Sequence, residues 1–158
     1  MPLTHTKEAR YLLGRFKFHR GFREGQALTH ALYEEVINTY LNQPLPAALI
    51  GVPTSFRNVI RRQHDQGQTL ADQLSARLGI RALRPLRRRH GQAQKHKTRA
   101  ERLKLNVSTF RVTRDIPFTH VAIVDDVLTT GSTVRAVART LHNVGVHRVD
   151  LWCATRSV

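Results

Sequence analysis

The stretch of residues 120–154 constrains the fold more than any other part of the sequence, because its apolar periodicity changes twice. Residues 120–125 contain four consecutive apolar residues, Val121 to Val124, and predict a buried strand, while residues 147–154 predict a second strand. Between them, residues 133–144 predict a helix with one apolar face, made of Val134, Val137, Ala138 and Leu141. Two strands joined by a helix and short connections run parallel. The sequence therefore predicts an α/β fold with a central parallel sheet flanked by helices.

The preceding residues continue this alternation of helices and strands. Residues 6–39 are predicted to be mostly helical, and the apolar run at residues 47–52 predicts a buried strand. Residues 58–78 predict a further helix, which ends at Gly79. The sequence contains no internal repeat, low-complexity tract or long linker. We therefore expect residues 1–158 to form a single domain.

The composition is that of a globular protein, with 41% apolar and 23% charged residues in a chain of 158. No apolar run approaches the roughly 20 residues that cross a bilayer, and the first residues do not resemble a secretory signal, so we expect no membrane partner. A single cysteine, Cys153, excludes an internal disulfide framework and a CxxC zinc module. A reducing cytoplasm is the simplest location for such a chain.

The charge is strongly positive, with 26 Lys and Arg residues against 11 acids and a formal net charge of +15. Twelve of these basic residues and only one acid, Glu101, lie within residues 81–114. We expect this stretch to be a mobile or partly extended insertion and not a core element. Three interpretations of it stay open: a hood that closes over a substrate, a track for nucleic-acid phosphates, or a solvated loop. It contains almost no aromatic residues, which argues against stacking on single-stranded bases.

Two acids and a hydroxyl-rich loop follow the strand predicted at residues 120–125. Asp125 and Asp126 come after four apolar residues, and ligands bind beyond the carboxyl ends of strands in an open parallel sheet. The loop that leads into the next helix contains Thr129, Thr130, Gly131, Ser132 and Thr133. Its amides, its hydroxyls and the positive end of the helix favour an anion. A ribose 5-phosphate fits this arrangement, because carboxylates accept hydrogen bonds from ribose hydroxyls or hold a metal while the loop holds the phosphate.

Other nucleotide-binding motifs compete with this interpretation. An apolar strand that ends in two aspartates is also typical of the magnesium-binding strand of P-loop NTPases, but the GxxxxGK[ST] motif of those proteins is absent from the sequence. The GxGxxG motif of dinucleotide-binding folds is absent as well. Helix capping accounts for Ser132 or Thr133 alone, and does not account for two adjacent acids together with the whole loop.

The thirteen residues from Val121 to Thr133, VAIVDDVLTTGST, resemble the phosphoribosyl-pyrophosphate motif of the type I phosphoribosyltransferases. The resemblance implies the type I phosphoribosyltransferase fold and a site for phosphoribosyl pyrophosphate. In that family the acid pair contacts the ribose 2′- and 3′-hydroxyls, and the threonine- and glycine-rich loop binds the 5-phosphate. The resemblance therefore implies catalytic and metal-binding roles for Asp125 and Asp126, and phosphate binding by residues 129–133.

Further segments resemble the ComF branch of that family, the competence-associated phosphoribosyltransferase-like proteins. FKF at residues 16–18 is similar to an amino-terminal signature of the branch, and RQHDQ at residues 62–66 takes the place of its RGFNQ segment. Residues 94–110 resemble its basic hood. LIGVPTS at residues 49–55 resembles the strand and loop that hold pyrophosphate in type I enzymes. By resemblance, substrate binding extends to Gly51, Val52, Pro53, Thr54 and Ser55.

The sequence also departs from the branch. RQHDQ lacks the glycine of RGFNQ and carries an acid in place of its asparagine. Most ComF-like proteins carry an amino-terminal cysteine-rich zinc module, which a sequence with one cysteine does not contain. Either the lineage is short, or the sequence begins after that module.

The resemblance implies a reaction as well as a ligand. A nucleophile, usually nitrogen, displaces pyrophosphate at C1 of the ribose, and Mg²⁺ on the pyrophosphate neutralises the leaving group. Arg57, Arg61 and Arg62 are candidate cations for the same role, although a solvated helix face accounts for them equally well. The alternative is a non-catalytic competence module that binds DNA and senses a phosphoribosyl ligand, which the +15 charge favours. The acceptor and the formation of a homodimer stay open.

Overall fold

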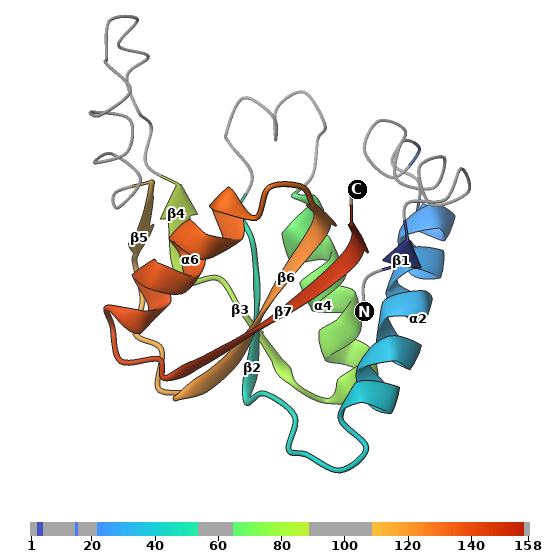
Figure 1. The fold of residues 1–158 in the computed structure, drawn as a ribbon, viewed down its shortest axis with the longest axis horizontal. Helices are drawn as coiled ribbons and strands as arrows, with labels where there is room; N and C mark the ends of the chain where they lie inside the picture. Colours follow the sequence, from blue (N-terminus) through green and yellow to red (C-terminus); the bar gives the residue numbers. More distant parts are fainter. Residues whose placement is uncertain (1–2, 5–14, 16–21, 54–64, 89–108, 157–158) are drawn as a thin grey trace, which may run out of the picture.

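The computed structural model of the chain describes residues 3–4, 15, 22–53, 65–88 and 109–156. In chain order, its elements are β1 (Leu3–Thr4), α2 (Phe22–Thr39), β2 (Ala48–Gly51), α4 (Gln66–Leu78), β3 (Arg81–Leu83), β4 (Leu86–Arg88), β5 (Phe110–Val112), β6 (His120–Leu128), α6 (Ser132–His142) and β7 (Arg148–Arg156). Two strand–helix–strand units, β2–α4–β3 and β6–α6–β7, make up most of the fold (Figure 1).

The central sheet has five strands in the order β1-β7-β6-β2-β3, and every pair of neighbours is parallel. The longest pairing joins β6 to β7, from His120 opposite Arg148 to Leu128 opposite Arg156. The parallel strand pair and the α/β fold predicted from the sequence are therefore confirmed. Strand β1 was not predicted; it pairs only with the last two residues of β7.

Helices cover both faces of this sheet (Figure 1). On one face, α2 and α4 bury an apolar cluster that we call the α2–α4 core, which includes Leu28, Leu32, Val36, Leu49, Leu70, Leu74, Val124 and Trp152. On the other face, α6 buries the α6 core, which includes Ile50, Leu86, Phe110, Val121, Ile123, Val137 and Leu141. The apolar stripe predicted for α6 is confirmed, because its members at i, i+3, i+4 and i+7 all pack in this core.

Two glycines let α4 lie directly against β2. A Cβ atom at Gly51 would lie 2.5 Å from the backbone of Gln68, and one at Gly67 would lie 2.9 Å from the carbonyl oxygen of Val52. Real Cβ atoms do not approach other heavy atoms so closely, so a side chain at either position forces the helix away from the strand. This close approach places the first turn of α4 at the carboxyl ends of β2 and β6.

The first turn of α4 differs from the sequence prediction. Asp65 has an extended backbone (φ −96°, ψ 104°) and serves as the N-cap, so α4 begins at Gln66 and the helix predicted over residues 58–78 is not continuous through Asp65. The predicted end is confirmed, because Gly79 adopts a left-handed conformation (φ 69°) and its amide donates to the carbonyl of Ser75 over 3.0 Å. Most of residues 6–21, and residues 54–64, lie outside the described part of the chain.

The expectation that residues 81–114 lie outside the core is wrong at both ends of that stretch. Residues 81–83 form β3 of the main sheet, and β4 pairs with β5 as an antiparallel two-stranded ribbon. Leu86 and Phe110 of this ribbon are buried in the α6 core. Basic and apolar residues alternate along β5, so the pleat of the strand puts them on opposite faces. Residues 89–108 lie outside the described part of the chain, and a hood there stays a prediction.

Candidate functional site

The predicted strand ended at Asp125, with the acid pair at its carboxyl end, whereas in the structure both acids lie within β6. The strand continues to Leu128 because β7 is equally long and keeps pairing with it through Thr155 and Arg156. The backbone amide of Asp126 donates to Asp125 Oδ1 over 2.9 Å. The carbonyl oxygen of Asp126 accepts a 3.3 Å hydrogen bond from Thr155 Oγ1, so β7 helps to hold the acid pair in place.

The regular pleat of β6 is interrupted at the two acids. Ile123 packs in the α6 core and Val124 in the α2–α4 core, as alternation along a strand requires. Val127 packs in the same core as Val124, although residues three apart in a regular strand face opposite sides. The alternation of side chains along β6 is therefore broken at Asp125 and Asp126. Neighbouring side chains in a regular strand point to opposite faces of the sheet, and this rule does not apply to the two carboxylates.

The loop after β6 is short and leads directly into α6. Gly131 adopts a left-handed conformation (φ 70°, ψ 4°) and is the N-cap of the helix, which begins at Ser132. The first intrahelical bond runs from the Arg135 amide to the Gly131 carbonyl over 2.9 Å. No side chain caps this helix end. The amides of the first turn, which have no partner inside a helix, are therefore presented at the end of the loop together with the positive end of the helix dipole.

The predicted hydroxyls lie at the same helix end. Thr130 Oγ1 donates to Ser132 Oγ over 3.1 Å, and the Ser132 amide approaches Thr130 Oγ1 at 3.4 Å. Thr129 and Thr130 precede the helix, while Ser132 and Thr133 begin it. The structure therefore brings the whole predicted loop to the carboxyl end of β6, two residues beyond the acid pair. This arrangement suits an anion that accepts hydrogen bonds from several donors at once.

Arg135 belongs to this loop, although the sequence reasoning missed it. Its side chain runs back toward the start of α6, and its guanidinium NH2 donates to the Thr130 carbonyl over 2.8 Å. Its NH1 atom lies 3.1 Å from the place that a Cβ atom at Gly131 would occupy. Basic side chains near a helix N-terminus oppose the helix dipole, and α6 has no acid in its first turn. A cation placed against the dipole is the sequence signal that points to an anionic ligand here.

A pocket of about 310 Å³ adjoins the loop. Three apolar side chains, two threonines and two arginines contribute to its lining: Leu128, Val134, Leu151, Thr129, Thr130, Arg135 and Arg156. The two arginines come from different elements, α6 and β7. This second cation, at the end of β7, was also missed, because only the pairing of β6 with β7 brings it to the loop.

The end of β2 lies beside the acid pair, because Gly51 pairs in register with Val124. The resemblance implies that residues 51–55 bind pyrophosphate, and two of these residues offer no free backbone amide. The Val52 amide donates to the carbonyl of Val124 over 2.9 Å, and Pro53 has no amide hydrogen, so neither supplies a donor to a ligand. Thr54, Ser55 and the candidate cations Arg57, Arg61 and Arg62 lie outside the described part of the chain.

Cys153 of β7 lies opposite Asp125 in the register of the two strands. Burial, and after it the negative charge of Asp125, raises the pKa of the Cys153 thiol to about 12. The thiol donates to the carbonyl of Thr155 over 3.0 Å. At neutral pH this side chain is a protonated, buried group and not a nucleophile.

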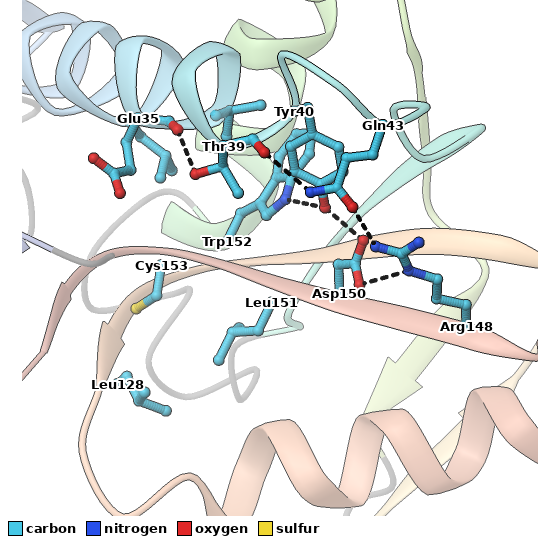
Figure 2. Close-up of a pocket in the computed structure, with 12 residues that line it drawn as sticks. Glu35, Thr39, Tyr40, Gln43, Leu128, Arg148, Asp150, Leu151, Trp152 and Cys153 are labelled. Atoms are coloured by element: carbon cyan, nitrogen blue, oxygen red, sulfur yellow. Dashed lines mark hydrogen bonds and ion pairs between the residues drawn. The ribbon is translucent and has the colours of Figure 1, made fainter.

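A second polar cluster lies at the other end of β6 and β7, where Asp150 accepts hydrogen bonds from several side chains. Its Oδ2 contacts the Tyr40 hydroxyl and lies 2.6 Å from His120 Nε2, and its Oδ1 accepts from Arg148 Nε over 3.2 Å. Trp152 Nε1 donates to the Tyr40 hydroxyl over 3.3 Å. Figure 2 shows four of these residues along a pocket of about 310 Å³ between α2 and β7. This cluster ties the end of α2 to the sheet.

Both acidic groups of this cluster have shifted pKa values. Burial alone raises the pKa of Asp150, but the hydrogen bonds from Tyr40, His120 and Arg148 outweigh it and hold the pKa below its ordinary value. Burial, and after it the hydrogen bond to Asp150, raises the pKa of Tyr40 to about 12. The negative charge of Asp150 is therefore balanced by hydrogen bonds within the protein.

No group of three or more His, Cys, Asp or Glu side chains in the described part of the chain could hold a metal ion. None of its helices combines the length and the apolar character that a membrane crossing needs.

Comparisons with known proteins identify the family of the chain. The family described as "Phosphoribosyl transferase domain" matches residues 36–156, which include the acid pair and the loop. The chain is 33% identical over 153 residues to "Competence protein F" of Haemophilus influenzae, covering 92% of this chain and 67% of that protein. It is 32% identical over 158 residues to "DNA utilization protein YhgH" of Salmonella typhi, covering 98% of this chain and 70% of that protein. The chain thus spans about two thirds of the length of these relatives.

Solved structures agree on the fold. A purine phosphoribosyltransferase from Pyrococcus horikoshii superposes with a TM-score of 0.53 at 24% identity, covering 83% of this chain and 71% of that one. An allosteric regulatory enzyme of purine biosynthesis superposes with a TM-score of 0.56 at 17% identity, covering 83% of this chain and 26% of that one. With the family match and the relatives, these findings confirm the type I phosphoribosyltransferase fold. The chain belongs to the phosphoribosyltransferase family, in its ComF-like branch.

Proposed function

We propose that this protein binds phosphoribosyl pyrophosphate with Mg²⁺ and transfers the phosphoribosyl group to a nitrogen nucleophile, with release of pyrophosphate. The observation that carries the proposal is the juxtaposition of Asp125 and Asp126 with the loop at the start of α6. An acid pair accepts hydrogen bonds from vicinal hydroxyls, and a helix N-terminus binds a phosphate. A ribose 5-phosphate presents both groups.

The loop binds the 5-phosphate in this proposal. Amides at the start of α6 and the hydroxyls of Thr130, Ser132 and Thr133 donate to the phosphate oxygens. Arg135 adds a positive charge and holds the Thr130 carbonyl in place, so that this carbonyl is turned toward Arg135 and not toward the anion. The cation and the helix dipole repel each other until an anion binds between them. Binding therefore relieves an unfavourable contact within the protein.

Asp125 and Asp126 fit a metal that arrives with its substrate. Mg²⁺ uses one or two carboxylates together with substrate phosphates and water, and the described residues offer no larger cluster of ligands. When bound, Mg²⁺ neutralises the charge that develops on the leaving pyrophosphate. The protein's own task is to hold the ribose so that C1 faces the nucleophile. The carboxylates also stabilise the positive charge that develops on the ribose as pyrophosphate leaves.

Calorimetric titration with phosphoribosyl pyrophosphate, with and without Mg²⁺, tests the binding step. We expect Mg²⁺-dependent binding that weakens by at least about 100-fold, or about 3 kcal/mol, in Asp125→Asn/Asp126→Asn. The matched control is Asp72→Asn/Asp115→Asn, which removes the same charge from surface positions and should bind as the wild type does. Binding that is absent from the wild type, or equal in both variants, contradicts the proposal.

A second candidate function is a module that binds nucleic acid and senses a phosphoribosyl ligand without turnover. The specific observation in its favour is that similar proteins are named for competence and for DNA utilization. Release of pyrophosphate from phosphoribosyl pyrophosphate, measured with a panel of nitrogenous bases and amines, separates the two functions. Acceptor-dependent release supports the transferase, and binding without release by any acceptor supports the module.

We also propose a cytoplasmic location. Cys153 is a free, buried thiol, and a reducing compartment keeps such a group intact. Cell fractionation with antibody detection tests this location, and recovery in the membrane or secreted fraction contradicts it.

A further inference from the structure

The ribbon formed by β4 and β5 has one apolar face and one basic face. Leu86, Phe110 and Val112 pack against the α6 core, so this face is turned toward the protein. Strand pleating places the intervening residues, Arg87 and Arg111, on the other face. Both are exposed. The orientation of the ribbon is therefore set by the burial of its apolar face, and its arginines point to solvent.

The two arginines of the outer face lie directly opposite each other. In the register of the ribbon, Arg87 is paired with Arg111, and side chains opposite each other in antiparallel strands have Cβ atoms about 4.5–5.5 Å apart. Like charges at such a pair are destabilising. Neither arginine forms a salt bridge in the described part of the chain, whereas Arg84 pairs with Asp72 and Arg148 with Asp150. The positive charges of Arg87 and Arg111 are therefore not neutralised by an acid of the described residues, and a bound anion could neutralise them.

The ribbon that carries Arg87 and Arg111 is fixed by hydrogen bonds and by packing. The Thr113 amide and its hydroxyl both donate to the Pro85 carbonyl, over 2.7 Å and 3.1 Å, and so extend the pairing beyond the ribbon's last residues. Arg88 lies over the ring of Phe110, 5.6 Å from its centroid, and is engaged there. Arg87 and Arg111 thus project from a paired, packed element, so little backbone ordering remains to oppose binding.

We propose that Arg87 and Arg111 bind the phosphodiester backbone of a nucleic acid strand. Guanidinium groups form bidentate hydrogen bonds with phosphate oxygens, and two side by side can grip neighbouring phosphates. Arg114, two residues beyond the end of β5, is exposed as well and adds positive charge next to the ribbon. The ribbon's one aromatic side chain is buried, so bases find no stacking partner on it and binding is independent of sequence. The inference places the nucleic-acid contact of the second candidate function, and is independent of the phosphoribosyl site.

Salt titration of binding to a fluorescent single-stranded oligonucleotide tests this surface. Each phosphate contact on a single strand contributes about 0.7 to the slope of log affinity against log salt, so Arg87→Ala/Arg111→Ala should make the slope shallower by about 1.4. At about 0.1 M salt this corresponds to a loss of affinity of roughly 25-fold. Two oligonucleotides of different base composition should bind alike. Arg87→Gln/Arg111→Gln provides an independent second version, and circular dichroism checks that both variants are folded.

The matched control is Arg23→Ala/Arg77→Ala, which removes two exposed arginines from α2 and α4 on the other face of the sheet (Figure 1). An equal change of slope in this control means that only the net charge matters and overturns the proposal. An unchanged slope in the ribbon variants also overturns it, while nucleic-acid binding elsewhere on the chain would survive. Weaker binding of phosphoribosyl pyrophosphate with unchanged oligonucleotide binding assigns the pair to the phosphoribosyl site instead. Oligonucleotide binding that persists in Asp125→Asn/Asp126→Asn supports the separation of the two sites.

Discussion

The two ends of the β6–β7 pair contain polar side chains of the same kinds in opposite arrangements. At the first residues of the strands, Asp150 accepts hydrogen bonds from Tyr40, His120 and Arg148, and its charge is neutralised within the protein. At the last residues, the hydroxyls of the loop contact one another, α6 has no side-chain cap, and Arg135 lies against the helix dipole. The same strands therefore support one end that is internally satisfied and one that is arranged for an anion.

This difference separates residues that stabilise the fold from residues that serve the ligand. Removal of Asp150 leaves donors without an acceptor in a half-buried environment, which lowers the free energy of unfolding. A change at the loop removes contacts that form only with the ligand, so it affects binding more than stability. Stability and affinity measured on the same variants should therefore respond in opposite ways at the two ends.

The largest expected effect concerns the backbone that supports the ligand end. Gly51→Ala should lower the free energy of unfolding by about 3 kcal/mol or more, because the new Cβ atom meets the backbone of α4 at 2.5 Å and neither element can move cheaply. Gly79→Ala is the matched control: its φ is 69° but nothing lies within 4 Å, so only the strain of about 1–2 kcal/mol applies. Urea unfolding measures both. Equal losses would mean that the close approach of β2 and α4 contributes nothing.

The next effect compares the two ends directly. Asp150→Asn should lower the free energy of unfolding by about 2 kcal/mol, since hydrogen bonds to a charged acceptor are lost or weakened, and should leave the affinity for phosphoribosyl pyrophosphate unchanged. Asp125→Asn should do the reverse, with lost affinity and a stability that is unchanged or higher. Urea unfolding and calorimetry on each variant check the pair. If Asp150→Asn weakens ligand binding as much as Asp125→Asn does, the two ends are not separate.

The local elements of both ends could be predicted from the sequence. The strand at β2 and the apolar face of α6 follow from short-range periodicity, which buried residues such as Ile50, Val137 and Leu141 obey. The loop residues were found because a short motif places hydroxyls, a glycine and acids within one connection. Features of this kind depend on neighbours in the sequence.

The features that the sequence did not predict depend on pairing between distant residues. β6 continues past Asp125, where the predicted strand ended, to Leu128 because β7 is long enough to pair with it there. The β4–β5 ribbon was taken for an insertion because Arg87 and Arg111 meet only through a pairing across more than twenty residues. Arg135 was not singled out by the sequence, and its place beside the loop became visible once α6 was seen to begin at Ser132.

The pH dependence of unfolding sharpens the comparison at the satisfied end. The lowered pKa of Asp150 contributes stability above its unfolded value near 3.9, and this contribution is lost as the pH falls through the folded pKa. The raised pKa of Tyr40 contributes stability below about pH 10, which is lost as the pH rises toward about 12. Asp150→Asn should remove the acid contribution and Tyr40→Phe the alkaline one, as urea unfolding across the pH range would reveal. If the stability of Tyr40→Phe falls above pH 10 as steeply as that of the wild type, Tyr40 is not the source of the alkaline contribution.

The smallest effect tests the cation that lies against the helix dipole. Arg135→Ala should weaken binding of phosphoribosyl pyrophosphate by about tenfold, or 1.4 kcal/mol, because one charge beside the 5-phosphate and the bond to the Thr130 carbonyl are lost. Its free energy of unfolding should stay within about 0.5 kcal/mol of the wild type, since the loss of that bond is offset by relief of the unfavourable dipole contact. Arg135→Lys keeps the charge without the planar fork and should recover part of the affinity. Calorimetry and urea unfolding of both variants decide the matter: a drop in stability with unchanged affinity would move Arg135 from the ligand end of the comparison to the structural one.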